Sequence, residues 1–376
     1  MSSAPGLLLQ SLRRPGLRPI FSAVLCVVLV ATLGGQSERL PTARLVRAPR
    51  IVMPGQVDSN VPMTWELVDG RWRLFALTSF AGIPARHSGP ALDQMQQAGP
   101  VAIVPHPGDG VWIESIVPDE SGVWYGYYHH ERAAAACGRS DRFIPRVGAV
   151  RSTDQGATWE HLGIILEAPI ESTACASSNM FVLGGAGDVS AVLDRTRTNL
   201  FLYFSQYTKN PSEQGVAVAR LAWADRDSPA GRVTVWRGEA WLPASRPVGT
   251  DTTSGGWAYP VGTPLVAPAR PWHDGHVAAD AFWGPSIHWN RYLDRYVMLV
   301  NRAANERFDN EGIYVSYAAR LDDPRGWSAP RKILNGGGWY PQVAGLEPAA
   351  GTDREAGQRA RFLLTGRSDY LIEFQR

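Results

Sequence analysis

The chain has 376 residues and a nearly balanced charge, with 37 Lys and Arg against 35 Asp and Glu. Lysine occurs only at positions 209 and 332, so the sequence carries no lysine-rich patch. This balance gives no electrostatic reason to expect nucleic acid or an anionic membrane as a partner.

The N-terminal region has the composition of a secretory signal. The first acidic residue is Glu38, and before it three arginines precede an apolar run at residues 21–33. A basic region, a short apolar core and small residues are typical of a signal peptide, and the run is short for a membrane span of about 20 residues. We expect residues 1–36 to be this signal and the protein to be secreted, periplasmic or in the cell envelope. An uncleaved signal anchor is the alternative.

The rest of the chain favours β-strands. Segments rich in aromatic and β-branched residues, many with period-two alternation, predict strands at residues 71–80, 122–131, 198–207, 286–303 and 311–320. Gly, Pro, Asp and Ser interrupt them at short intervals, which indicates turns. Residues 90–100 predict a short helical turn, and the Pro- and Gly-rich residues 242–271 predict a long surface loop.

Three stretches share one pattern, at residues 146–166, 214–236 and 311–334. Each has a strand, an Asp-containing turn and a second strand that begins near Trp or Val, as repeated propeller blades do. About 340 residues remain after the signal, and blades of about 60–70 residues divide them into five. We predict an all-β, five-bladed β-propeller at residues 51–376, with residues 37–50 as a linker. Pairing of an N-terminal strand with the last blade would close it.

The turn Ser152-x-Asp154-x-Gly156-x-Thr158-Trp159 resembles the Asp box of sialidase-type propellers. Asp and Ser side chains can satisfy backbone N–H groups, Gly takes a positive φ, and Trp packs between sheets. The resemblance implies a scaffold turn at the outer edge of a blade, away from the active site.

The layout of residues 57–65, 111–117, 184–194 and 280–302 is similar to five-bladed glycoside hydrolases. These are the arabinanase/xylosidase group, the invertase/levansucrase group and the propellers that cleave D-arabinan. The resemblance implies that acids at the starts of the inner strands act in a central funnel. Glycoside hydrolysis needs one acid that protonates the leaving oxygen and a second that activates water or attacks carbon.

Four acids stand where blades should begin: Asp58, Glu114, Asp188 and Asp280. We predict Asp58 as base or nucleophile, Glu114 as general acid and Asp188 as a residue that orients the acid or binds a hydroxyl. Asp280 would bind the sugar. The chain departs from the related families in having Asp280 rather than Glu in the fourth blade and its extra Glu in the second. This departure leaves the identity of the general acid open. Turn caps and salt-bridge partners are the alternative roles for all four.

We predict six further side chains as sugar contacts: His129, His130, Trp112, Trp283, Arg86 and Tyr340. Neighbouring strand residues point to opposite faces, so only one of the paired histidines can face the funnel. This favours a substrate contact over a His-His-Glu metal site, and core packing is the alternative for the aromatics. We expect no cofactor and no metal ligands, and a structural calcium ion in the funnel stays open.

Beyond Cys26, the cysteines are Cys137 and Cys175, which flank the Asp-box hairpin. In an oxidising compartment two cysteines favour a disulfide over a metal site, with unpaired thiols as the alternative.

Two functions of different classes remain. The first is an exported glycoside hydrolase, a glycosidase acting on a polysaccharide or oligosaccharide as a monomer. The second is a non-catalytic propeller that binds carbohydrate or protein. Carboxylates gathered in one funnel would favour the enzyme, and scattered, salt-bridged acids would favour the binder.

Overall fold

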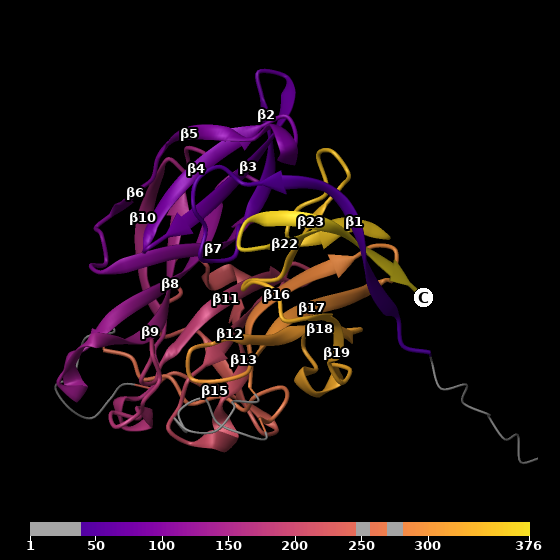
Figure 1. Cartoon of the computed structure of the whole chain (residues 1–376). Helices are drawn as coiled ribbons and strands as arrows, with labels where there is room; N and C mark the ends of the chain where they lie inside the picture. The colour runs from indigo at the N-terminus through magenta and orange to yellow at the C-terminus, as the bar shows by residue number, and fades with distance from the viewer. Residues whose placement is uncertain (1–38, 246–255, 269–280) are drawn as a thin grey trace, which may run out of the picture. The chain divides into compact units, whose positions relative to one another are not determined.

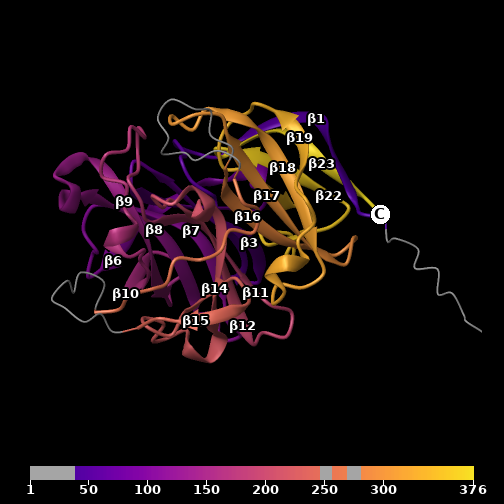
Figure 2. The ribbon, with the colours of Figure 1, turned by 90° about the horizontal axis from the view of Figure 1, so that it is seen from below.

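In the computed structural model, which describes residues 39–245, 256–268 and 281–376, five β-sheets surround a central axis (Figures 1 and 2). This arrangement confirms the predicted five-bladed β-propeller. Among these residues, no helix has the length and apolar character needed to cross a membrane.

The blades follow the chain in order. Blade 1 contains β2 (Met63–Val68), β3 (Arg71–Phe80), β4 (Ile83–Gly89) and β5 (Gln96–Pro100). Blade 2 contains β7 (Gly110–Pro118), β8 (Trp124–Ala134), β9 (Arg139–Ser152), β10 (Thr158–Leu166) and β6 (Ala102–Val104). Blade 3 contains β11 (Ala186–Leu193), β12 (Asn199–Gln206), β13 (Gly215–Ala222), β14 (Thr234–Arg237) and β15 (Ala240–Pro243).

Blade 4 contains β16 (Phe282–Asn290), β17 (Arg295–Ala303), β18 (Asn310–Ala318), β19 (Arg331–Asn335) and β21 (Glu355–Ala356). Blade 5 contains β20 (Gln342–Gly345), β22 (Arg359–Leu364), β23 (Arg367–Gln375) and β1 (Thr42–Val52). Short 3₁₀ turns lie at Leu92–Gln94, Ala135–Cys137, Ile170–Ser172, Pro211–Glu213, Trp223–Asp225 and Pro324–Gly326.

The ring closes where β1 pairs with the C-terminal strand β23, antiparallel from Thr42↔Gln375 onward (Figure 1). An N-terminal strand therefore covers the edge of the last blade, as expected. It begins earlier than expected, because Thr42–Val52 occupies most of the predicted linker at residues 37–50. The sequence there, with arginines among apolar residues and many exposed positions, suits an outer strand.

Alternation along the strands supplies a different core on each side of a blade. On β12, Leu200, Leu202 and Phe204 pack toward blade 2. Phe201 and Tyr203, between them in the sequence, pack toward blade 4. Because successive side chains point to opposite faces, one apolar strand joins two neighbouring blades.

The predicted hairpins occupy equivalent places, since β9–β10, β13–β14 and β18–β19 are the third and fourth strands of blades 2, 3 and 4. The predicted strand at residues 286–303 is a hairpin, because the ladder between β16 and β17 turns after Asn290↔Arg295. Residues 90–100 form a single 3₁₀ turn followed by β5.

The turn between β9 and β10 is held by its own side chains. The Asp154 carboxylate accepts the backbone N–H of Thr158 at 2.9 Å, and Ser152 Oγ accepts that of Gly156 at 2.9 Å. Gly156 has a φ of 81°, and a Cβ there would lie 2.9 Å from Trp124. Trp159 is buried. The turn is scaffold, and its kinship with the sialidase-type Asp box stays a prediction.

Candidate active site

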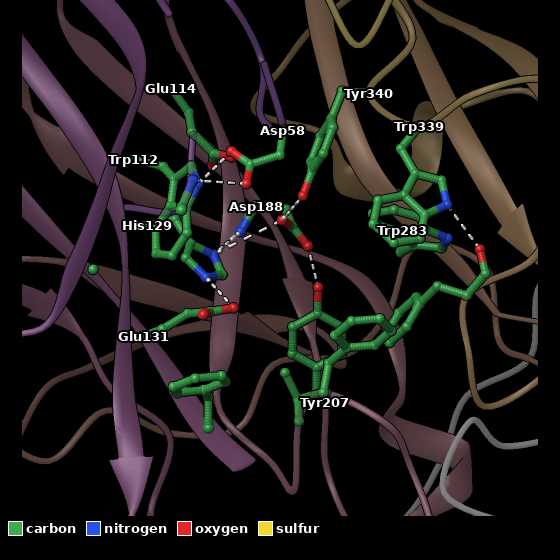
Figure 3. A pocket seen from close by; sticks show the side chains of 16 residues that line it. Asp58, Trp112, Glu114, His129, Glu131, Asp188, Tyr207, Trp283, Trp339 and Tyr340 are labelled. Atoms are coloured by element: carbon green, nitrogen blue, oxygen red, sulfur yellow. Dashed lines mark hydrogen bonds and ion pairs between the residues drawn. The ribbon is translucent and has the colours of Figure 1, made fainter. Parts of the chain in front are cut away.

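A pocket of about 430 Å³ lies where the inner strands begin (Figure 3). Four acids from different strands or loops line it: Asp58 before β2, Glu114 on β7, Glu131 on β8 and Asp188 on β11. We call it the funnel pocket. Three of these acids come from the starts of three successive blades, which only the closed ring brings together.

Register breaks in the inner strands coincide with the funnel pocket. The ladder between β7 and β8 shifts at Glu114, and the ladder between β11 and β12 shifts across Asp188 and Val189. The ladder between β16 and β17 shifts after Trp283. A bulge re-aims a side chain and is common beside active sites. Asp188 also has a φ of 44°, a left-handed conformation that Asp tolerates better than most residues.

Asp58 is held as a hydrogen-bond acceptor. Its Oδ1 accepts the indole N–H of Trp112 at 2.6 Å, and its Oδ2 accepts the backbone N–H of Ala81 at 3.0 Å. Burial raises the pKa of Asp58, while these two hydrogen bonds oppose the rise because they stabilise the charged form. Burial prevails, so the pKa of Asp58 lies above its ordinary value, and the two hydrogen bonds limit this rise.

The second acid, Glu114, is buried. It is 3% exposed, and its Oε2 accepts the backbone N–H of Val189 at 2.5 Å. Burial raises the pKa of Glu114 well above its usual range, and the nearby charge of Asp188 raises it further. Glu114 therefore keeps its proton at a pH where an exposed glutamate has lost it.

Asp188 is fixed by two tyrosines from other strands and loops. Its Oδ2 accepts the hydroxyl of Tyr207, and its Oδ1 accepts the hydroxyl of Tyr340 at 3.4 Å. Burial raises the pKa values of both tyrosines well above their usual range, so both remain donors. The Asp188 carboxylate is thus oriented within reach of Glu114.

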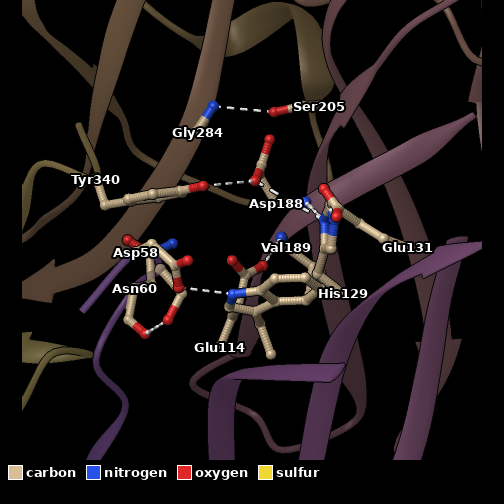
Figure 4. A network of polar contacts seen from close by, with 12 residues as sticks. Asp58, Asn60, Glu114, His129, Glu131, Asp188, Val189, Ser205, Gly284 and Tyr340 are labelled. Atoms are coloured by element: carbon tan, nitrogen blue, oxygen red, sulfur yellow. Dashed lines mark hydrogen bonds and ion pairs between the residues drawn. The ribbon is translucent and has the colours of Figure 1, made fainter. Parts of the chain in front are cut away.

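His129 links two of the acids (Figure 4). Its Nδ1 accepts the backbone N–H of Asp188 at 2.9 Å, and its Nε2 lies 3.6 Å from Glu131 Oε1. Burial lowers its pKa, but the hydrogen bond to Glu131 and the charges of Asp188 and Glu114 outweigh burial and raise the pKa to about 9. An imidazolium cannot accept a hydrogen bond, so the geometry shown is that of the neutral ring, and protonation would have to break the contact with Asp188 N–H.

Glu114, His129 and Asp188 also have donor atoms close enough for a possible metal site. One donor atom each from Glu114, His129 and Asp188 lies within 4.8 Å of the others. However, His129 Nδ1 already accepts a backbone N–H and its Nε2 faces Glu131. Its ring would have to give up one of these contacts to bind a cation, so the donor set fits a hydrogen-bonded acid cluster better than a metal centre.

The wall opposite the acids is aromatic (Figure 3). The ring centroid of Trp283 lies 5.0 Å from that of Phe308 and 5.6 Å from that of Trp339, both edge to face. Phe181 packs against Trp339 at 6.0 Å, and Tyr340 completes the wall beside Asp188. One side of the funnel pocket is therefore acidic and the other is apolar.

A disulfide fixes the rim of the funnel pocket. Cys137 and Cys175 are bonded, with Cα atoms 5.1 Å apart, which confirms the predicted pair. Cys175 belongs to the segment that leads into β11, and Phe181 of this segment reaches the aromatic wall. Its neighbour Met180 donates its N–H to the carbonyl of Glu306 at 3.1 Å, which ties the segment to blade 4.

Most sequence-predicted site residues meet in the funnel pocket. Those that line it are Asp58, Trp112, Glu114, His129, Asp188, Trp283 and Tyr340. Asp280 lies outside the described residues.

Two of the selected residues, His130 and Arg86, do not line the funnel pocket. His130 points away from the funnel pocket, where its Nδ1 accepts from Arg146 at 2.8 Å and its Nε2 lies 3.0 Å from the carbonyl of Gly108. Strand alternation put His129, not His130, on the funnel side. Arg86 binds the carbonyls of Ala98 and Gln155 at 3.0 and 3.2 Å, so it braces the β9–β10 turn rather than a substrate.

Some lining residues escaped the sequence analysis. Tyr207 follows β12, the strand that returns to the funnel, so strand direction could have indicated it. Glu131 ends the predicted strand at residues 122–131 and was considered only as a metal ligand. Phe181 and Phe308 come from loops without periodicity, and no signal marked them.

No family model matches the sequence, and no curated protein does. Among solved structures, the α-L-arabinanase of Cellvibrio cellulosa is similar, at 14% identity and a TM-score of 0.48 over 85% of this chain and 91% of that one. The endo-arabinase of Bacteroides thetaiotaomicron matches at 10% identity and a TM-score of 0.47, over 86% and 95%. The GH62 α-L-arabinofuranosidase catalytic domain of Coprinopsis cinerea matches at 9% and 0.47, over 88% and 97%. At such low identities, these likenesses leave the activity of this chain to the chemistry of its own pocket.

Proposed function

We propose that the protein is a glycoside hydrolase that cleaves an oligosaccharide or polysaccharide in the funnel pocket. One observation carries this proposal: Asp58, Glu114 and Asp188, from three blades, line a single pocket. Their surroundings push Glu114 toward the protonated form while Asp58 is hydrogen-bonded as a carboxylate. Two carboxyl groups in different protonation states are the apparatus of glycoside hydrolysis.

Each acid has a role that follows from its contacts. Glu114 protonates the leaving oxygen, because burial and the charge of Asp188 keep its proton in place near neutrality. Asp58 acts as base on a water or as nucleophile, because Trp112 and Ala81 favour its charged form. Asp188 orients and tunes the acid, since its carboxylate lies beside Glu114 and is clamped by tyrosines. While its ring is neutral, His129 accepts the backbone N–H of Asp188; its charged ring would instead face the carboxylates of Asp188 and Glu131.

The aromatic wall supplies the sugar-binding side. The C–H faces of a pyranose or furanose ring are apolar, and Trp283, Trp339 and Tyr340 offer a matching surface opposite the acids. Trp112 donates a hydrogen bond to Asp58 and also lines the pocket, so it can both position the acid and contact the sugar. Asp280 remains a proposed sugar contact.

The proposal includes export to the cell envelope or beyond. The apolar run at residues 21–33 after three arginines supports a secretory signal. The Cys137–Cys175 disulfide supports an oxidising compartment, because such bonds rarely persist in the cytosol.

The test is activity of the purified, oxidised protein on a panel of furanosidic and pyranosidic glycans, measured by the release of reducing ends. The proposal expects cleavage of at least one glycan class by the wild type and cleavage at least about 100-fold slower by Asp58→Asn at equal concentration. A protein that binds a glycan from the panel with wild-type affinity in both forms, and cleaves none, would instead be a carbohydrate-binding propeller.

A further inference from the structure

A second pocket, of about 440 Å³, lies where the inner strands end. Val117 near the end of β7 and Leu193 at the end of β11 line it, whereas Glu114 and Asp188 of the same strands line the funnel pocket. Five residues of strand separate Asp188 from Leu193, which corresponds to about 15 Å. The two pockets therefore open at opposite ends of the propeller.

Three arginines line this second pocket, which we call the arginine pocket: Arg195, Arg197 and Arg354. The guanidinium of Arg195 lies 4.4 Å from the ring centroid of Trp289, so stacking holds its planar group in place. Arg197 pairs with Glu120, whose side chain is 70% exposed. An ion pair with so exposed a partner is weak and leaves Arg197 available to another anion.

Arg354 is half-buried, whereas Arg195 and Arg197 are exposed. The Nε of Arg354 is shielded from solvent and has no hydrogen-bond partner. Burial lowers the pKa of Arg354, the charges of Asp353 and Glu355 oppose this, and the charge of Arg197 lowers it by a smaller amount. A shielded donor without an acceptor is costly, and an anion beside it would supply the missing contact.

The acids near this pocket are engaged elsewhere. The Asp194 carboxylate accepts the backbone N–H groups of Thr198 and Asn199 at 2.8 and 3.2 Å. Glu355 pairs with Arg291 at 3.2 Å. Asp353, the chain neighbour of Arg354, is buried and accepts the N–H of Met63 at 2.8 Å. Three arginines therefore line the pocket against two acids, Asp194 and Glu355, whose carboxylates already have partners.

We propose that the arginine pocket binds a saccharide that carries an oxyanion, either a phosphate or a carboxylate. Guanidinium groups match the geometry of such oxyanions, because two parallel N–H bonds can reach two oxygens. The volume lies in the range of small-molecule sites and exceeds what a lone inorganic ion would fill. Trp65 and Trp289 in the lining supply apolar surface for the sugar ring. This proposal does not rest on catalysis in the funnel pocket.

The test is calorimetric titration at low salt with four probes: glucose 6-phosphate, glucuronate, glucose and inorganic phosphate. We expect at least one of the two anionic sugars to bind, more tightly than glucose and more tightly than inorganic phosphate. Which of the two binds identifies the oxyanion. Arg195→Gln and Arg197→Gln should each weaken that binding by about tenfold or more, as loss of a charge-assisted contact does.

Two control variants keep the result specific. Arg44→Gln changes an exposed arginine on β1 that pairs with Glu373 and should bind like the wild type. Asp58→Asn, in the funnel pocket, should also bind like the wild type, whatever happens to its activity. The proposal is overturned if neither anionic sugar binds, if glucose or inorganic phosphate binds equally well, or if both arginine variants keep wild-type affinity. Loss of binding in Asp58→Asn alone would move the ligand to the funnel pocket and also overturn it.

Discussion

The funnel pocket and the arginine pocket lie at the two ends of the same inner strands. Their ionisable groups differ in kind: carboxyl groups line the first, and guanidinium groups line the second. In the funnel pocket, Glu114 and Asp188 are 3% and 4% exposed. Burial and the charge of Asp188 raise the pKa of Glu114, which favours its protonated form. In the arginine pocket, guanidinium groups keep their charge at any ordinary pH, and Arg195 and Arg197 are exposed. Crowding among acids creates a proton donor, whereas crowding among arginines creates a site for an anion.

The largest expected effect is on turnover, which should fall in funnel-pocket variants and not in an arginine-pocket variant. Glu114→Gln and Asp58→Asn should each lower turnover by about 10²- to 10⁴-fold, because each removes one half of the acid–base pair. The melting temperature should stay nearly unchanged, since both substitutions preserve shape. Arg195→Gln should retain wild-type turnover. Steady-state kinetics on the cleaved glycan measures this, and full activity in either acid variant would refute that residue's role.

A buried histidine near the end of β16 that leads to the arginine pocket should make the fold sensitive to acid. His288 is fully buried, neither ring nitrogen has a hydrogen-bond partner, and burial lowers its pKa to about 3. Above pH ~6.5 the ring is neutral in both folded and unfolded chains. As the pH falls from there toward 3, the unfolded chain gains a proton that the folded one refuses. Stability should therefore fall by up to about 1.4 kcal/mol per pH unit.

Urea unfolding at several pH values between 7 and 4 measures this slope. His288→Leu should flatten it, whereas the variant His106→Gln, at an exposed position, should keep it. An unchanged slope in His288→Leu would mean that other groups cause the acid sensitivity.

The stability of the protein should depend on the Cys137–Cys175 disulfide at the rim of the funnel pocket. Replacing Cys137 and Cys175 together by Ser opens a loop with a sequence separation of 38 residues. In the chain-entropy model, this lowers the free energy of unfolding by about 3–4 kcal/mol. Denaturant unfolding of the variant and of the reduced wild type should agree. A loss below about 1 kcal/mol in both would show that the rim holds without the bond.

The subtlest effect tests the like-charge argument inside the funnel pocket. Asp188→Asn removes a charge that raises the pKa of Glu114, so that pKa should fall. The basic limb of the pH–rate profile reports the general acid and should move to lower pH. Glu131→Gln removes an acid that contacts His129 rather than Glu114 and should move the limb less. A limb that stays in place in Asp188→Asn would contradict the coupling.

Much of the architecture could be predicted because it depends on local patterns. Period-two alternation indicated β3 and β12, and the spacing of Cys137 and Cys175 around one hairpin indicated the disulfide. The acids were predicted through the resemblance to five-bladed glycoside hydrolases, in which inner strands begin at the central funnel. Register breaks at Glu114 and Asp188 could not be predicted, because a bulge depends on the partner strand.

Long-range contacts account for the other differences. Arg86 looked like a substrate contact, but its partners are carbonyls of β5 and of the β9–β10 turn, which only the folded ring brings near. Phe181 reaches the aromatic wall through a loop whose path is set by a disulfide and by blade 4. No periodic sequence pattern indicates either placement.

We propose that Glu114 and Asp58 act together on the glycosidic bond of a glycan bound in the funnel pocket. The most direct measurement is a crystal structure of Glu114→Gln with a glycan that the wild type cleaves. We predict that the scissile oxygen lies within hydrogen-bond distance of the residue 114 side chain, with the anomeric carbon facing Asp58 and the sugar against Trp283. A glycan bound with its scissile bond outside the funnel pocket would contradict the account.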